Sequence, residues 1–147
     1  MAQTRRAEAN WSGDLGSGGG TVSAVSSGIF ADQAITWHAR TEAAEGKTSP
    51  EELLAAAHAS CYAMALSHGL AQGGNVAERV NVSVEVNADK TDSGWTVLSS
   101  AITVRATVPG LDAAGFAEAA DAAKAGCPIS KALSDSVEVT VDAALEG

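Results

Sequence analysis

The strongest constraint in this sequence is one long helix, bounded by a capping signal and a pair of glycines. Ser49 is a typical N-cap, Pro50 suits the first helical position, and Glu52, three residues after the cap, completes a capping box. The run LLAAAHASCYAMALSHGLAQ follows and ends at Gly73 and Gly74. At about 1.5 Å per residue, this helix is long enough to cross a whole domain.

The alanines of this helix indicate its surroundings. They flank Cys61 on both sides and offer little bulk, so another helix can approach this segment closely. Hydrophobic residues make up 46% of the chain but aromatic residues only 4%, which indicates a core of small side chains. We therefore expect a central, buried helix.

Extended structure interrupted by glycines is expected before the helix. The Gly-rich run over 16–20 lacks the Lys-Ser/Thr pair of a phosphate loop and precedes a strand-like segment, so we interpret it as a turn. Alternation over 35–40 predicts a strand whose polar face carries His38 and Arg40.

The chain beyond Gly74 alternates between strand and helix signals. The expected elements are a strand over 80–86, a turn at 91–94, a strand over 95–108, a helix from Asp112 to about Ala125, a short helix from Pro128 and a strand over 137–141. Strands that flank segregated helices are typical of an α+β fold. No internal repeat or linker divides the sequence, so we expect a single domain over residues 1–147.

The charge balance excludes two classes of partner. Nine Lys and Arg residues face eighteen Asp and Glu, a formal charge of −9, and the cations are scattered, whereas nucleic acid requires clustered ones. No stretch approaches about 18 consecutive apolar residues, and no apolar run follows the basic pair near the start. We expect a cytoplasmic protein that binds neither nucleic acid nor a membrane.

The two cysteines are the first candidates for chemistry. A permanent disulfide between Cys61 and Cys127 would be unusual in a reducing compartment. Cys127 lies between Gly126, which ends one expected helix, and Pro128, which begins another, and a helix N-terminus lowers the pKa of a thiol. Cys61 lies in mid-helix and needs a cation for the same effect. Buried free cysteines that act as small hydrophobes are the alternative.

Arg40 is the first candidate for that cation, because a guanidinium stays charged even when it is partly buried. A solvated Arg40 on an edge strand is one alternative interpretation. Arg79, Arg105 or His58 as the partner of the mid-helix cysteine is another.

Glu51 is the carboxylate that the capping box leaves without a local partner, since the box uses Glu52. Ten residues separate Glu51 from Cys61, which is about 15 Å of rise on one continuous helix. The two can share a site only if Glu51 comes from a second copy of the chain or the helix breaks. Antiparallel packing of two such helices would create two equivalent sites. An ordinary first-turn glutamate, favoured by the helix dipole, is the alternative.

Zinc binding and acyl transfer are the other chemistries that these residues suggest. His58, His68 and Cys127 could supply zinc ligands, but their spacing is unlike CxxC or HExxH. A Cys–His nucleophile would require an oxyanion-hole glycine pattern, and none follows either cysteine. We therefore expect no metal.

Three motifs together resemble the OsmC family, whose sister branch contains the organic hydroperoxide resistance proteins: WSGDLGSGGGTVS, TSPEELLAAAHASCYAMALS and AAKAGCPISKAL. The resemblance covers nearly the whole chain. It implies an α+β homodimer in which two chains interleave, with antiparallel sheets around a long central helix that carries the first cysteine. Two active sites would then lie at the dimer interface.

The resemblance also implies roles for four residues. Cys61 attacks the peroxide and becomes a sulfenic acid, and Cys127 resolves it as a disulfide. Arg40 and Glu51 match the family's other site positions, where Arg40 supplies positive charge and Glu51 orients the guanidinium by a bidentate contact. The implied function is thiol-dependent reduction of organic hydroperoxides in oxidative and osmotic stress.

The resemblance implies no bound cofactor and an external dithiol reductant of lipoyl type. A pocket lined by Ala, Leu and Met would favour alkyl hydroperoxides over hydrogen peroxide. The alternative is a non-catalytic or metal-binding dimeric stress protein of the same fold.

Overall fold

A computed structural model describes residues 1–147 as two compact units, Met1–Leu53 and Leu54–Gly147. Helix α2 (Pro50–Gln72) begins in the first unit and has most of its length in the second. That residues 1–147 form a single domain stays a prediction. No helix combines the length and the apolar character that spanning a membrane requires.

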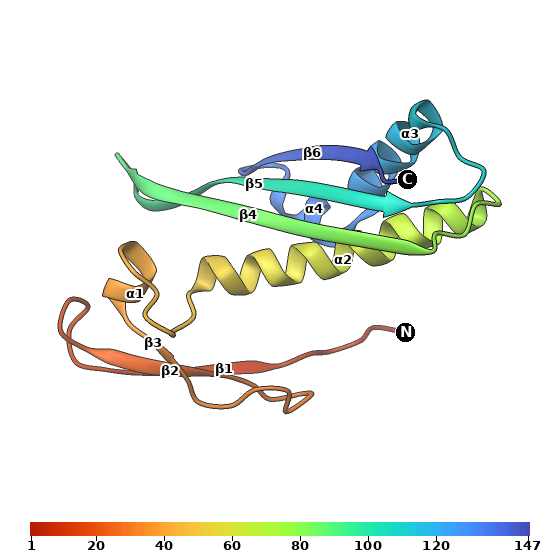
Figure 1. Ribbon diagram of the computed structural model, residues 1–147. Helices are drawn as coiled ribbons and strands as arrows, with labels where there is room; N and C mark the ends of the chain where they lie inside the picture. Colours follow the sequence, from red (N-terminus) through yellow and green to blue (C-terminus); the bar gives the residue numbers. More distant parts are fainter. The chain divides into compact units, whose positions relative to one another are not determined.

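The first unit contains a small antiparallel sheet in the order β1–β2–β3 (Figure 1). Its strands are β1 (Ala7–Ser12), β2 (Gly19–Ala24) and β3 (Gln33–Ile35). The Gly-rich run is a turn only over residues 16–18, because Gly19 and Gly20 already belong to β2. Gly20 lies so close to the neighbouring strand that an added Cβ would stand 1.9 Å from the carbonyl oxygen of Asn10.

The expected strand over 35–40 is wrong beyond Ile35. A short helix, α1 (Trp37–Thr41), follows instead, and it carries Arg40. Thr36 begins this helix because its Oγ1 accepts a hydrogen bond from the backbone N–H of Ala39 at 3.1 Å. The alternation of polar and apolar side chains carries no information about this local capping contact. The contact favours a helix over a strand.

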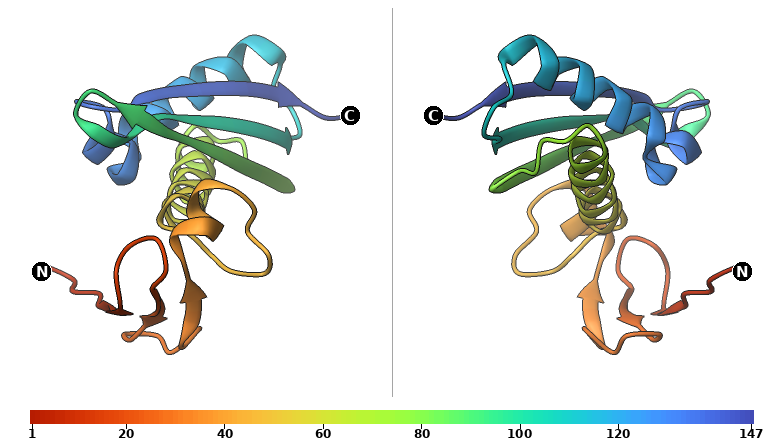
Figure 2. Two further views of the ribbon diagram at one scale, coloured as in Figure 1. Left: turned by 90° about the vertical axis from the view of Figure 1, so that its left-hand side faces the viewer. Right: turned by 90° about the vertical axis from the view of Figure 1, so that its right-hand side faces the viewer.

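The second unit contains a three-stranded sheet in the order β4–β5–β6. Its elements after α2 are β4 (Arg79–Thr91), β5 (Gly94–Thr107), α3 (Ala113–Gly126), α4 (Pro128–Leu133) and β6 (Glu138–Leu145). The hairpin, the helix capped by Asp112 and the helix that begins at Pro128 are all confirmed. Figure 2 shows a curved sheet with α2 beneath it.

One strand departs from the expected antiparallel sheets. β4 and β5 pair antiparallel across their tight turn, but β6 pairs parallel to β5. A parallel partner needs a long crossover connection, and α3 with α4 supplies it. The α+β class holds, because the helices are segregated from the hairpin in the chain order.

The core of the second unit lies between one face of its sheet and one face of α2. Alternate residues of β5, such as Ile102 and Val104, are almost fully buried there, with Phe116 of α3 against them. A four-residue spacing selects the buried face of α2: His58, Tyr62, Leu66 and Leu70.

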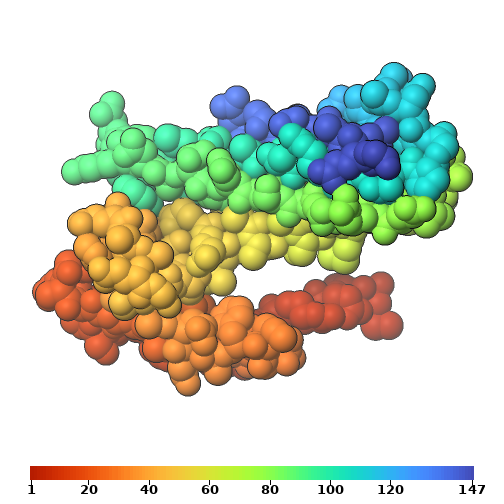
Figure 3. All heavy atoms as spheres, viewed as in Figure 1, coloured from red at the N-terminus to blue at the C-terminus, as the bar shows by residue number.

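We expected α2 to be buried, and in the single chain only one face of this helix is buried. Met64 is 67% exposed, and the yellow residues of α2 reach the molecular surface in the space-filling view (Figure 3).

Candidate active site

The two cysteines meet in the second unit. The Sγ atoms of Cys61 and Cys127 lie 3.1 Å apart, and both thiols are free. Cys61 comes from the middle of α2, whereas Cys127 lies at the junction where α3 ends and α4 begins. Two residues on separate elements thus form a vicinal dithiol.

Cys127 is fully buried, and its sulfur is the N-cap of α4. Its Sγ accepts a hydrogen bond from the backbone N–H of Ser130 at 3.5 Å. Burial by itself raises the pKa of Cys127, but the Ser130 backbone, the Cys61 thiol and the Ser130 side chain stabilise the thiolate, so the net pKa shift is downward. The expected acidic thiol at this helix start is confirmed.

Cys61 has the opposite electrostatic setting. Its side chain is partly exposed, yet burial raises the pKa of its thiol, and the hydrogen bond with Cys127 raises that pKa further. The expectation that a mid-helix cysteine among alanines is a weak acid is confirmed. A reactive Cys61 therefore needs positive charge from elsewhere.

Arg40 and Glu51 form a bidentate ion pair in the first unit. The Nε of Arg40 donates to both carboxylate oxygens of Glu51 at 3.0 and 3.2 Å, and Nη2 donates to Oε1 at 2.8 Å. The Arg40 guanidinium also lies over the ring of Trp37, 5.7 Å from its centroid. These contacts hold the guanidinium in one orientation.

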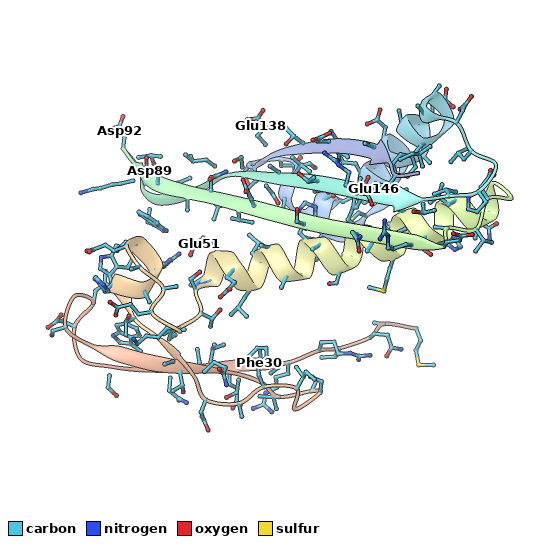
Figure 4. The ribbon with its side chains drawn as sticks, viewed as in Figure 1. Phe30, Glu51, Asp89, Asp92, Glu138 and Glu146 are labelled. Carbon is cyan, nitrogen blue, oxygen red and sulfur yellow. The ribbon has the colours of Figure 1, made fainter.

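The first turn of α2 explains why Glu51 is available, and it corrects one detail. Ser49 caps the helix, since its Oγ accepts the N–H of Glu52 at 3.1 Å, but the Glu52 carboxylate accepts from the Thr48 hydroxyl and does not close the capping box. Glu51 projects from this turn (Figure 4). Glu51 takes no part in capping, as expected, and its carboxylate makes the bidentate contact with Arg40 that the resemblance implied.

Helix α2 is continuous from Pro50 to Gln72. Glu51 and Cys61 therefore remain about 15 Å apart in rise along this one helix. Of the two routes that could bring Glu51 and Cys61 to one site, a break in α2 is excluded by this continuity.

Sequence reasoning missed a buried polar cluster beside the dithiol. Nδ1 of His58 lies 2.6 Å from Oγ of Ser100, and Nε2 lies 2.7 Å from Oγ of Ser130. All three residues are almost completely buried, and burial lowers the pKa of His58. One signal in the sequence could have found it. His58 precedes Tyr62, Leu66 and Leu70 at a spacing of four residues, which places it on the buried face of α2.

The other candidates have different environments. His68 is exposed, both ring nitrogens of His58 face serine hydroxyls, and nowhere do three or more His, Cys, Asp or Glu residues gather as a metal site would require. Arg105 donates to the Asp142 carboxylate, and Arg79 forms an ion pair with Glu146. Both arginines are thus held by carboxylates of the second unit.

An apolar hollow of about 290 Å³ lies between α2 and α3. It is lined by Ala65, one turn after Cys61, and by Gly126, next to Cys127, together with His68, Gly69, Ala119, Ala122 and Ala123. Apart from His68, the lining is alanine and glycine, without the Leu and Met side chains that we expected. The hollow is thus mostly apolar, and its lining includes residues close in the chain to both cysteines.

An α+β fold with two free thiols in contact is typical of thiol-based redox proteins. The OsmC family model, described as "OsmC-like protein", matches residues 43–142. The chain is 39% identical over 142 residues to Peroxiredoxin OsmC of Escherichia coli, covering 97% of this chain and 96% of that protein. It is 32% identical to the Organic hydroperoxide resistance protein OhrA of Bacillus subtilis, covering 77% and 79%.

Solved structures agree with these relatives. The crystal structure of the Organic Hydroperoxide Resistance Protein OhrB of Bacillus subtilis has a TM-score of 0.73 at 26% identity, over 95% of this chain and 98% of that one. A Legionella pneumophila organic hydroperoxide resistance protein OsmC gives 0.72 at 25% identity, over 98% of both chains. The chain belongs to the OsmC family, and it is a peroxidase-type enzyme.

Proposed function

We propose that this protein reduces organic hydroperoxides to alcohols through a sulfenic acid on Cys61 and a disulfide between Cys61 and Cys127. The carrying observation is the 3.1 Å separation of two free thiols that differ in exposure. Cys61 is partly exposed, whereas Cys127 is fully buried. A peroxide can reach the exposed sulfur first, which makes Cys61 the attacking thiol and Cys127 the resolving one.

The chemistry balances with these two sulfurs. The Cys61 thiolate attacks the terminal oxygen of the hydroperoxide, the O–O bond breaks, and the alkoxide leaves with the electron pair and takes a proton to give the alcohol. Cys61 is oxidised to a sulfenic acid. The Cys127 thiolate then attacks the Cys61 sulfur, the S–O bond breaks, and hydroxide leaves and is protonated to water.

Arg40 is the proposed activating cation. Because burial raises the pKa of Cys61, a nearby guanidinium is needed to stabilise its thiolate and the developing alkoxide. The ion pair with Glu51 gives the Arg40 guanidinium a defined orientation before any substrate binds. Glu51 is in this proposal a positioning residue.

A homodimer is the proposed form of the active enzyme. Within one continuous α2, Glu51 stays about 15 Å of rise from Cys61, so the ion pair of one chain would serve the Cys61 of its partner. The exposed, alanine-rich sides of α2 around Ser60 and Met64 support close approach of a second copy.

The proposed substrates carry an alkyl group, and the proposed reductant is a dithiol. The apolar hollow between α2 and α3 suits a hydrocarbon chain better than water or hydrogen peroxide, and three of the relatives are named for organic hydroperoxide resistance. An external dithiol of lipoyl type would reduce the disulfide and be oxidised to its own disulfide. Such a cycle requires no resident cofactor, and it suits the cytoplasm.

Free-thiol counting and intact mass after one equivalent of cumene hydroperoxide test this proposal. The expected result is loss of both thiols and of two hydrogen atoms, with no oxygen added. The matched Cys127→Ser variant should gain oxygen on Cys61 instead. Retention of both thiols by the wild-type protein would contradict the proposal and favour a non-catalytic or metal-binding stress protein.

A further inference from the structure

We propose that His58 is a positioning residue for the resolving step, acting through Ser130 to hold the Cys127 sulfur ready to attack Cys61. The inference deepens the proposed function and rests on it. It starts from a buried imidazole that peroxide cleavage itself does not use. His58, Ser130 and Cys127 all lie within the second unit.

The geometry forms a chain of contacts from β5 to the dithiol. Ser100 Oγ lies 2.6 Å from His58 Nδ1, and His58 Nε2 lies 2.7 Å from Ser130 Oγ. Ser130 in turn donates its backbone N–H to the Cys127 sulfur at 3.5 Å, and that sulfur lies 3.1 Å from Cys61. His58 and Ser100 have no exposed surface, and Ser130 is only 3% exposed, so water does not compete for these contacts.

The hydrogen positions follow from the protonation state of His58. Burial lowers the pKa of His58, so its ring is neutral and has one donor and one acceptor nitrogen. With the proton on Nε2, the ring donates to Ser130, whose hydroxyl proton is then free to point at Cys127. The Ser100 hydroxyl satisfies Nδ1 as a donor. The opposite tautomer would draw the Ser130 proton to the ring and away from the sulfur.

The first tautomer agrees with the state of Cys127, because the Ser130 side chain is one of the groups that lower the pKa of that thiol. The other titratable groups around Cys127 are Cys61 and Tyr62, both from α2. The Tyr62 hydroxyl donates to the carbonyl of Ala120 and has a raised pKa, so it stays neutral.

The chain of hydrogen bonds orients donors, and no proton needs to travel along it. The Cys127 thiolate gives an electron pair to the Cys61 sulfur, the S–S bond forms, and the S–O bond of the sulfenic acid breaks. Hydroxide leaves from Cys61 and takes its proton from solvent. His58 thus keeps its neutral form throughout the step.

The test measures the pKa of Cys127 by carbon NMR of its Cβ in a common Cys61→Ser background, with no peroxide present. Ser130→Ala removes the hydroxyl but keeps the backbone N–H, and it should raise the pKa by about one unit. His58→Asn keeps an amide near the position of Nδ1 and loses the contact with Ser130, so we expect a similar rise.

Two conservative variants serve as controls. His58→Gln places an amide donor near the position of Nε2, and Ser130→Thr keeps the hydroxyl, so both should retain most of the low pKa. A purely structural role for His58 would not separate Asn from Gln in this way. An unchanged Cys127 pKa in folded Ser130→Ala protein would overturn the inference and leave the proposed peroxidase function untouched.

The kinetic consequence is measured in the background that retains both cysteines. In a single turnover, Ser130→Ala should slow disulfide formation at neutral pH by up to about tenfold, because a pKa one unit higher reduces the thiolate fraction by at most that factor. The preceding formation of the sulfenic acid should keep its wild-type rate. Equal slowing of both phases would contradict a role confined to resolution.

Discussion

The sulfur atoms of Cys61 and Cys127 lie 3.1 Å apart although 66 positions separate the two residues in the chain. A disulfide requires about 2.05 Å, so oxidation needs the two sulfurs to approach by only about 1 Å. One sulfur is partly exposed and weakly acidic, and the other is buried and more acidic. This asymmetry suits two thiols with successive tasks.

Replacement of either cysteine should stop the cycle at a different point. We expect Cys61→Ser to abolish reduction of organic hydroperoxides, because Cys127, the other free thiol, is fully buried and out of reach of a peroxide. Cys127→Ser should permit one turnover and leave Cys61 as a sulfenic acid that overoxidises. Steady-state assays with a dithiol donor and intact mass measure both outcomes. Multiple turnover by Cys61→Ser would rule out the mechanism.

Arg40→Ala should raise the pKa of Cys61 toward or above the free-thiol value of about 8.5, because burial already disfavours the thiolate. Peroxide attack should slow more at neutral pH than at high pH. Thiolate absorbance titrated in a Cys127→Ser background, where only Cys61 can respond, measures the pKa. Arg40→Lys and Glu51→Gln are the matched controls, and each should have a smaller effect. An unchanged Cys61 pKa would remove Arg40 from the activating role and return attention to Arg79 and Arg105.

Mixed dimers should reveal whether the ion pair and the thiols come from different chains. Neither Arg40→Ala nor Cys61→Ser should be active alone. If Arg40 of one chain serves Cys61 of its partner, a heterodimer of the two variants contains one intact site and should recover about half of the wild-type activity. Tandem-tag purification isolates that heterodimer. The shared-site proposal would be contradicted if the heterodimer recovered no activity, or if sedimentation showed that the active enzyme is a monomer.

Burial of His58 predicts a specific dependence of stability on pH. Its pKa is lowered from 6.5 in the folded chain, so the unfolded chain binds a proton more readily. The corresponding contribution to the free energy of unfolding is present above about pH 6.5 and is lost as pH falls through the folded-state pKa. His58→Gln has no titrating ring there, so its thermal midpoint should fall less steeply with acidification. Parallel pH profiles for the two proteins would contradict this assignment.

Local interactions account for most of the structure that could be predicted from the sequence. The helix start at Ser49, the hairpin turn before Gly94 and the caps at Asp112 and Cys127 depend on residues within a few positions of one another. Short-range hydrogen bonds and the alternation of polar and apolar residues depend directly on the order of residues in the chain. The same kind of pattern failed over residues 35–40, where the capping contact of Thr36 overrode the alternation.

The chemical site depends on contacts that no local pattern contains. Motif resemblance identified Cys61, Cys127, Arg40 and Glu51 as a set, but only the folded chain brings the two sulfurs together and pairs Arg40 with Glu51. The crossover through α3 and α4 sets both the parallel strand β6 and the place of Cys127.

His58 shows the same division most clearly. In the sequence it is one histidine in an apolar row, open to interpretation as a zinc ligand or a core residue. Its two serine partners lie 42 and 72 positions away, so its role depends on packing of α2 against β5 and α4. Burial then holds the ring neutral, because desolvation penalises the charged form, and a neutral ring can orient hydrogen bonds at a thiolate.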